Sequence, residues 1–393
     1  MRFLILNAGS SSLKFDLMET AEGTSRRLRS GSFVDAHGAL RLETDAASPA
    51  APGTLRTLDA AADFLLTWLA GEKLLGDLSA TVHRIVHGGE KFRATTRLND
   101  LDLATLASLD EIAPLHNPPA RAVIARVRAR LGAALPLIGV FDTAYYASLP
   151  EAAWRYAVPA RWYAQFGVRR YGFHGTAHRY LCQAARARLT PARPTRRIVS
   201  LQLGRGCSVT ASLDDRAVAT SMGFTPLEGL VMGTRSGDID PGALLYMLEH
   251  SGMSVEEIRS ELNSASGLLG LSGRSADMHE LLALEEKGDA GAALAIEIFC
   301  RRARHYLGAY VSELGAVDVI AFGGGIGEHA PEIRRRILEK FEWAGIVLDP
   351  DANRTSSAGS IAAAGSATAI EVIRVDEASV MAAEAAALLA RAA

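Results

Sequence analysis

The chain has 393 residues, 49% of them hydrophobic, and a formal net charge of −2 at pH 7. This length suffices for two domains with buried cores, and scattered rather than clustered Lys and Arg argue against nucleic acid as a partner. Three cysteines without CxxC spacing, no signal peptide and no long apolar run predict a cytoplasmic protein that does not enter a membrane.

The first part of the chain reads as strands and helices in succession. Short apolar or alternating runs predict strands at 3–6, 13–17, 27–34, 39–43, 81–86 and 136–141. Apolar residues at helical spacing predict a helix within 55–75. A second helix is expected at 117–131, because Pro118 and Pro119 suit the first turn of a helix.

The second part repeats this pattern. Strands are predicted at 198–203, 209–213, 217–221 and 317–322, long helices at about 241–261 and 290–314, and a docked terminal helix at 378–393. The segments LILNAG from Leu4 and VSLQLG from Val199 have a similar shape, and each is followed by serine and a new alternating strand. The order predicts an α/β protein with two similar domains facing each other over a cleft.

Glycine- and serine-rich loops occur at 7–12, 204–208 and 323–327. Small residues expose backbone N–H groups that bind anions. One such loop alone would be read as a tight hairpin, but three favour a nucleotide. Lys14 follows the first loop, and the third precedes a helix expected near Pro331. No Gly-Lys-Ser/Thr follows, so this is not a Walker A loop.

These and further motifs resemble the acetate and propionate kinase family of the actin and sugar-kinase superfamily. The matching segments include HRIVHGGE from His83, YGFHGTAH from Tyr171, and SMGFTPLEGLVMGTRSGDIDP from Ser221. The resemblance covers nearly the whole chain. It implies two duplicated actin-like (ribonuclease H-like) α/β domains around a nucleotide cleft. Residues 1–147, completed by the helix 378–393, would form one domain. Residues 148–377 would form the other, with the nucleotide site and the interface of a homodimer.

The implied reaction transfers phosphate from ATP to a small carboxylic acid, with acetate as the first expectation. Arg84 is then expected to bind the carboxylate, and Arg235 and His174 to stabilise the transferring phosphoryl group. Asp142 is implied as an acid/base or as an orienting group. Because a carboxylate acceptor is already ionised at pH 7, the orienting role is favoured. The resemblance implies an apolar acyl pocket lined by Val86, Leu115, Phe173 and Pro226, although all four could equally be core residues.

The resemblance also implies Asn7 and Glu377 as ligands of Mg²⁺, with Mn²⁺ as an alternative. His174 and His178 stand four residues apart, a possible metal face, but no carboxylate lies between them to make an HExxH site. The implied nucleotide-binding residues are Ser12, Lys14, Gln202, Leu203, Gly204, Arg205, Gly206, Asp277, Met278, His279, Gly325, Ile326, Gly327, Glu328 and His329.

The second loop departs from the family pattern. Gln202 and Arg205 stand where the family has histidine and an asparagine or serine, and His279 replaces a common arginine. Arg205 is either a replacement phosphate ligand or a solvated side chain, and a changed phosphoryl donor is a third reading. The alternatives to acetate phosphorylation are therefore a propionate or other short-chain acyl kinase and a nucleotide-binding sensor. A hydroxyl kinase, with Asp142 as a true base, is disfavoured by the apolar acyl pocket.

Overall fold

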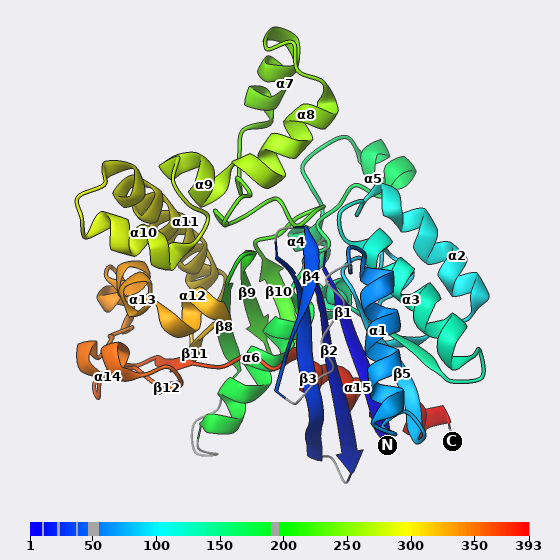
Figure 1. Cartoon of the computed structure of the whole chain (residues 1–393). Helices are drawn as coiled ribbons and strands as arrows, with labels where there is room; N and C mark the ends of the chain where they lie inside the picture. The colour runs from blue at the N-terminus through cyan, green and yellow to red at the C-terminus, as the bar shows by residue number, and fades with distance from the viewer. Residues whose placement is uncertain (10–11, 22–23, 37, 46–54, 190–195, 393) are drawn as a thin grey trace. The chain divides into compact units, whose positions relative to one another are not determined.

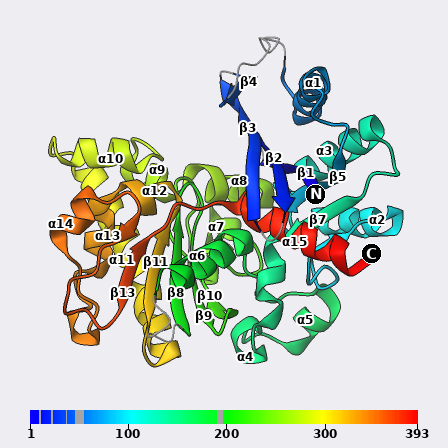
Figure 2. The same ribbon diagram turned by 90° about the horizontal axis from the view of Figure 1, so that it is seen from below.

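The computed structural model describes residues 1–392 except 10–11, 22–23, 37, 46–54 and 190–195. Two central residues of the first glycine- and serine-rich loop therefore lie outside the described residues. Contacts divide the chain into two compact units, Met1–Ala147 with Asp376–Ala393, and Ser148–Val375. Figures 1 and 2 show the elements of both units.

In the described residues, the first unit contains a seven-stranded sheet with the order β4-β3-β2-β1-β5-β7-β6. The central strand β1 pairs antiparallel with β2 and parallel with β5, which pairs parallel with β7. The strands are β1 (Arg2–Ala8), β2 (Ser12–Ala21), β3 (Thr24–Ala36), β4 (Ala39–Thr44), β5 (Leu78–Ile85), β6 (Thr96–Arg97) and β7 (Leu137–Phe141).

Helices cover both faces of this sheet. Successive side chains of β1 point to opposite faces, so they pack against different helices. Leu4 and Leu6 pack in the core formed with α1 (Leu58–Gly71) and α3 (Asn117–Leu131). Phe3 and Ile5 pack on the opposite face with side chains of α15 (Glu377–Ala392). Figure 2 shows α15 beside β1 and β2. The remaining helix of this unit, α2 (Asp100–Ser108), begins with a capping box at Asn99 and Asp102.

The second unit repeats the order of pairing in a six-stranded sheet, β10-β9-β8-β11-β13-β12. Its first strand, β8, pairs antiparallel with β9 and parallel with β11, as β1 does with β2 and β5. The strands are β8 (Arg197–Leu203), β9 (Cys207–Leu213), β10 (Arg216–Thr220), β11 (Val319–Gly323), β12 (Gly359–Ser360) and β13 (Ala369–Val372). The two sheets therefore share one topology, and the α/β fold class with duplicated units is confirmed.

Helix α6 covers one face of this sheet, and α11 contacts β8 and β9. Helix α11 begins at the N-cap Asp289 and ends where Gly315 takes a left-handed φ of 70°. The helices of this unit are α4 (Glu151–Trp154), α5 (Ala160–Phe166), α6 (Gly175–Arg188), α7 (Pro241–His250), α8 (Val255–Ser260), α9 (Gly267–Ser272), α10 (Met278–Glu285), α11 (Ala290–Leu314), α12 (Gly324–His329), α13 (Pro331–Leu338) and α14 (Pro350–Thr355).

Two predicted elements are wrong in detail. The long helix expected at 241–261 is broken, because Gly252 takes a φ of 73° and a capping box at Ser254 and Glu257 starts α8 anew. The third loop is also not an open turn, since residues from Gly324 onward form α12 directly after β11. Within the described residues, no helix combines the length and hydrophobicity that a transmembrane segment requires.

Candidate active site

In the first unit, three polar side chains lie at one level of the sheet. Asn7 near the end of β1 is paired with Lys14 on β2 and with Arg84 on β5. Asp142 directly follows β7, the neighbour of β5. Since parallel strands end at the same edge of a sheet, these side chains gather at the carboxyl ends of β1, β5 and β7.

Arg84 is the centre of this group. Its Nε and Nη2 donate to the two carboxylate oxygens of Asp142, at 3.0 and 2.6 Å, and its Nη1 donates to Asn7 Oδ1 at 3.2 Å. Glu377 Oε1 lies 3.6 Å from Nε. Burial disfavours the charge on Arg84, but the carboxylates of Asp142 and Glu377 outweigh burial and raise its pKa. The guanidinium has five N–H groups, so two of them remain for an anionic ligand.

The backbone after β5 is held by a reciprocal amide pair. His87 N donates to Asn117 Oδ1 at 3.1 Å, and Asn117 Nδ2 returns a bond to His87 O at 3.0 Å. Gly88 N donates to Thr143 Oγ1 at 3.0 Å. These contacts connect three motifs that are distant in sequence and fix the loop beyond Arg84. Asn117 and Thr143 were missed as site-supporting residues.

In the second unit, α6 presents a polar face to β8 and β9. His174, His178 and Cys182 are four residues apart and meet three buried serines of these strands. His174 Nδ1 lies 2.8 Å from Ser208 Oγ, and both nitrogens of His178 are hydrogen-bonded to serine hydroxyls. The described structure therefore satisfies these histidines by hydrogen bonding, and it contains no group of three or more His, Cys, Asp or Glu arranged to hold a metal.

The second glycine-rich loop lies against His174 and Arg235. A Cβ added to Gly206 would stand 3.1 Å from His174 Nε2 and 3.8 Å from Arg235 Nη1. Only glycine leaves this space open. Arg235 Nη1 donates to the carbonyl of Pro226 at 3.3 Å, and burial lowers the pKa of this arginine. Burial also raises the pKa of Cys207 to about 12, so its thiol stays neutral.

The loop that carries Arg235 is braced from several sides. Glu228 accepts from Tyr156 and Arg170, and Tyr156 Oη accepts from Phe224 N at 2.9 Å. Asp238 Oδ1 accepts from Gly229 N at 2.8 Å. Asp238 therefore holds this loop together. Asp240 is the N-cap of α7.

A cavity of about 360 Å³ opens beside the second loop. It gathers eight of the predicted nucleotide-binding residues, from the loop after β8, the start of α10 and helix α12, together with Ala276, Leu282 and Ala330. The eight are Gly204, Arg205, Asp277, Met278, His279, Gly325, Ile326 and His329. Arg205 is exposed, and its guanidinium has no hydrogen-bond or ion-pair partner among the described residues. A mostly apolar cavity with convergent polar groups is typical of a small-molecule site.

The other predicted nucleotide-binding residues lie elsewhere. Glu328 Oε1 accepts from Gly324 N and Val375 N, at 3.1 and 3.2 Å, and thereby caps α12. Gln202 is the counterpart of Asn7 near the end of its sheet's first strand, and its buried Oε1 has no hydrogen-bond partner among the described residues. Leu203, Gly206 and Gly327 do not line the cavity, and Ser12 and Lys14 belong to the first unit.

The four predicted acyl-pocket residues divide between the units. Val86 and Leu115 belong to the first unit, where Leu115 is 45% exposed. Phe173 and Pro226 belong to the second unit and are buried.

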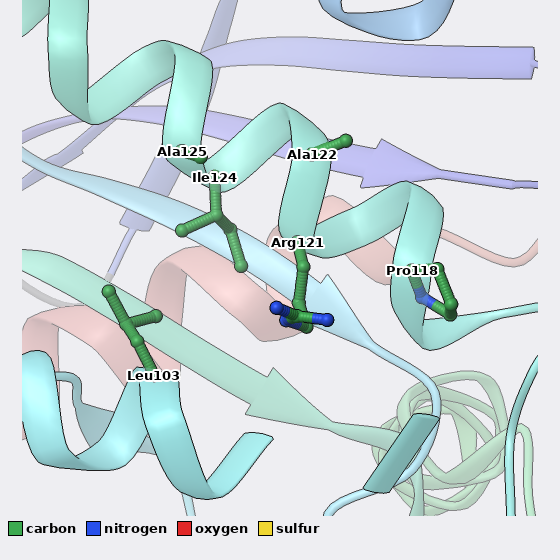
Figure 3. Close-up of a pocket in the computed structure, with 6 residues that line it drawn as sticks. All are labelled: Leu103, Pro118, Arg121, Ala122, Ile124 and Ala125. Carbon is green, nitrogen blue, oxygen red and sulfur yellow. The ribbon is translucent and has the colours of Figure 1, made fainter. Parts of the chain in front are cut away.

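A second cavity, of about 350 Å³, lies between α2 and α3 (Figure 3). Leu103 and Ile124 contribute apolar walls, and Arg121 extends toward the space from α3. Arg121 is paired with Asp110. This cavity is lined by none of the predicted catalytic, substrate-binding, nucleotide-binding or metal-binding residues.

The repeated sheets define a duplicated α/β fold, and the comparisons with known proteins place the chain among the phosphotransferases that act on a carboxyl group. A solved propionate kinase from Francisella tularensis is similar, with a TM-score of 0.90, 36% identity and 98% of each chain covered. Porphyromonas gingivalis acetate kinase has a TM-score of 0.87 and 34% identity, with 99% of each chain covered.

The chain belongs to the Acetokinase family, which it matches over residues 2–383. An acetate kinase of Solibacter usitatus is 44% identical over 370 residues, covering 90% of this chain and 89% of the relative. One of Coprothermobacter proteolyticus is 40% identical over 391 residues, covering 96% of each. The family expected from the sequence motifs is confirmed.

Proposed function

We propose that this chain transfers the γ-phosphoryl group of ATP to acetate, giving ADP and acetyl phosphate in a reversible reaction. Its relatives among the acetate kinases and the state of Arg84 support this proposal. A buried arginine whose charge is secured by Asp142, and which keeps two N–H groups for an anion, suits the carboxylate of a small acid. The proposal retains the two expected domains, 1–147 with 378–393, and 148–377.

The proposed transfer is direct and in line. An acetate oxygen attacks the γ-phosphorus, the bond to the β-phosphate oxygen breaks, and its electron pair leaves with ADP. No proton is removed from the acceptor, so Asp142 orients Arg84 rather than acting as a base. Arg235 and His174 stabilise the charge on the transferring group, and their position beside Gly206 supports this role.

The cavity beside Arg205 is the proposed nucleotide site, with Asp277 to His279 and Gly325 to His329 around the adenosine. Asn7 and Glu377 are the proposed ligands of Mg²⁺ or Mn²⁺. The oxygen atoms Asn7 Oδ1 and Glu377 Oε1 both lie close to the Arg84 guanidinium, and oxygen ligands completed by water and phosphate suit these ions. The metal would neutralise phosphate charge.

Propionate is the alternative acceptor, supported by the likeness to a propionate kinase. Val86, Leu115, Phe173 and Pro226 are the proposed acyl-binding residues. We expect the preference to depend on the space beside Phe173. Phe173→Ala should therefore improve kcat/KM for propionate relative to acetate.

The test is acyl phosphate formation. The protein is incubated with ATP, Mg²⁺ and acetate, propionate or butyrate, and acyl phosphate is trapped with hydroxylamine; a parallel arm replaces ATP by pyrophosphate. Acetyl hydroxamate formed with ATP is the expected result. Acyl hydroxamate formed with pyrophosphate but not with ATP would refute ATP as the phosphoryl donor. If no acid gives acyl hydroxamate, the result would favour a nucleotide-binding sensor.

We also propose that the protein is a cytoplasmic homodimer, the location following from its use of ATP. Helix α7, labelled in Figure 1, has no buried residue. It exposes the side chains of Leu245, Tyr246, Met247 and Leu248. A helix with apolar side chains all round is typical of one covered by another chain. Light scattering after size exclusion should give a dimer mass for the wild type and a monomer for Leu245→Glu/Tyr246→Glu. A wild-type monomer would contradict the proposal.

A further inference from the structure

We infer that Ser208 and His178 are positioning residues, which orient His174 and determine which of its ring nitrogens carries a proton. The inference rests on the proposed phosphoryl-stabilising role of His174. It begins from a chain of buried polar groups behind that residue, in a layer where most neighbours are apolar. Ser200, Ser208 and His178 are each fully buried.

The chain is continuous. His174 Nδ1 lies 2.8 Å from Ser208 Oγ, and Ser208 Oγ lies 2.7 Å from His178 Nε2. His178 Nδ1 lies 2.7 Å from Ser200 Oγ, which donates to the carbonyl of Thr210 at 3.5 Å. The serines and Thr210 lie on β8 and β9, His178 lies on α6, and His174 is the N-cap residue of that helix, so regular elements hold the groups in place.

Counting the available protons assigns a donor and an acceptor to each hydrogen bond in this row. In the assignment that we infer, Ser200 donates its hydroxyl proton to the Thr210 carbonyl and accepts from His178 Nδ1–H. A neutral imidazole has one donor and one acceptor nitrogen, so His178 Nε2 accepts from Ser208. Ser208 has then used its proton and must accept from His174 Nδ1–H. We therefore assign the ring proton of neutral His174 to Nδ1.

The other ring nitrogen of His174, Nε2, faces the second glycine-rich loop at Gly206. Cε1 and Nε2 of His174 are the atoms that a Cβ on Gly206 would meet at 3.1 Å. His174 also has a left-handed backbone, with φ of 58°, which is uncommon for a residue other than glycine. The bond through Nδ1 thus aims Nε2 at the loop, and only the imidazolium form of the ring donates from that nitrogen.

Ser208→Ala removes this bond with little change in volume. We expect kcat to fall about 10- to 100-fold, because misorientation of a charge-stabilising group slows transfer, while KM for ATP and acetate changes little. Ser212→Ala is the matched control. Ser212 is a buried serine of the same strand that contacts Cys182 of α6 instead of a histidine. It should retain wild-type kcat.

Two substitutions of His178 separate positioning from packing. Gln places its amide near the position of Nε2 and can still bind Ser208, whereas Asn reaches only toward Ser200. His178→Gln should keep most of the turnover and His178→Asn should lose it, at comparable melting temperatures. Equal kcat for the two variants, or losses that follow stability alone, would overturn the inference.

Nitrogen NMR of histidine-labelled protein tests the proton directly. The wild type should show His174 protonated on Nδ1, and Ser208→Ala should shift that signal toward a mixture of tautomers. A neutral His174 with its proton on Nε2 in the wild type would refute the direction of the chain. This measurement needs no turnover, so it remains decisive even where the acyl phosphate assay fails and the proposed function with it.

Discussion

Asp142→Asn tests whether this carboxylate acts through Arg84 or as a catalytic group of its own. The Asp142 side chain is 1% exposed, and both of its oxygens accept from the guanidinium. Asparagine keeps one acceptor oxygen and turns an NH₂ group toward an arginine N–H. The change therefore removes one charge-assisted hydrogen bond and the negative charge beside Arg84, and leaves the shape of the side chain nearly intact.

The expected loss follows from these contacts. A hydrogen bond to a charged group contributes about 1.5–3 kcal/mol. Breaking a buried ion pair costs about 3–5 kcal/mol in total, because the remaining charge stays buried. At about 1.4 kcal/mol for each factor of ten, kcat/KM for acetate should fall roughly 10²- to 10³-fold.

The assay is a double-mutant cycle with Arg84→Leu, using the acyl hydroxamate rate at saturating ATP. If Asp142 works only by orienting Arg84, its replacement should cost little once Arg84 is absent, so the double variant should resemble Arg84→Leu. If the rate loss of the double variant equals the product of the losses of the two single variants, the reasoning is refuted and Asp142 has a chemical role independent of Arg84. Melting temperatures of all variants exclude unfolding as the cause.

Three further changes test the second unit. Arg235→Ala should lower kcat at least about 10²-fold with a smaller effect on KM for ATP, since Arg235 acts on transition-state charge, and a near-normal kcat would remove it from the mechanism. Arg205→Ala should raise KM for ATP about tenfold, with partial recovery in Arg205→Lys, and unchanged kinetics would mean that this side chain is only solvated. Gly206→Ala should lower kcat by displacing His174 while ATP binding measured by calorimetry persists; full activity would show that the loop can give way.

Much of the sheet architecture was readable from the sequence because strands buried on both faces leave continuous apolar runs. The range predicted for α11, 290–314, agrees with the structure for a different reason: Asp289 and Gly315 are strong local signals at its ends. The helix expected at 241–261 was wrong because apolar spacing continued across Gly252, whose left-handed backbone outweighed it.

The pairing within the site was harder to predict. Residue type alone left Arg84 and Asp142 as separate candidates, because strand order decides that β5 and β7 are neighbours. The hydrogen bonds of Ser208 and Ser200 were missed altogether. The available signal was the alternation of side chains along β8, which puts Ser200 and Gln202 on the face that α6 covers. A polar side chain on a buried face requires a hydrogen-bond partner.

Helix α15 has a consequence for how the first unit is made. Phe3, Ile5 and Val82 lie on a sheet face whose cover, Ala378 to Ala385, follows the whole second unit in the sequence. While the ribosome is still translating the second unit, this face has no native partner and exposes apolar surface. The first unit therefore completes this core only after the second unit has been synthesised, and its uncovered sheet face favours aggregation until α15 packs on it.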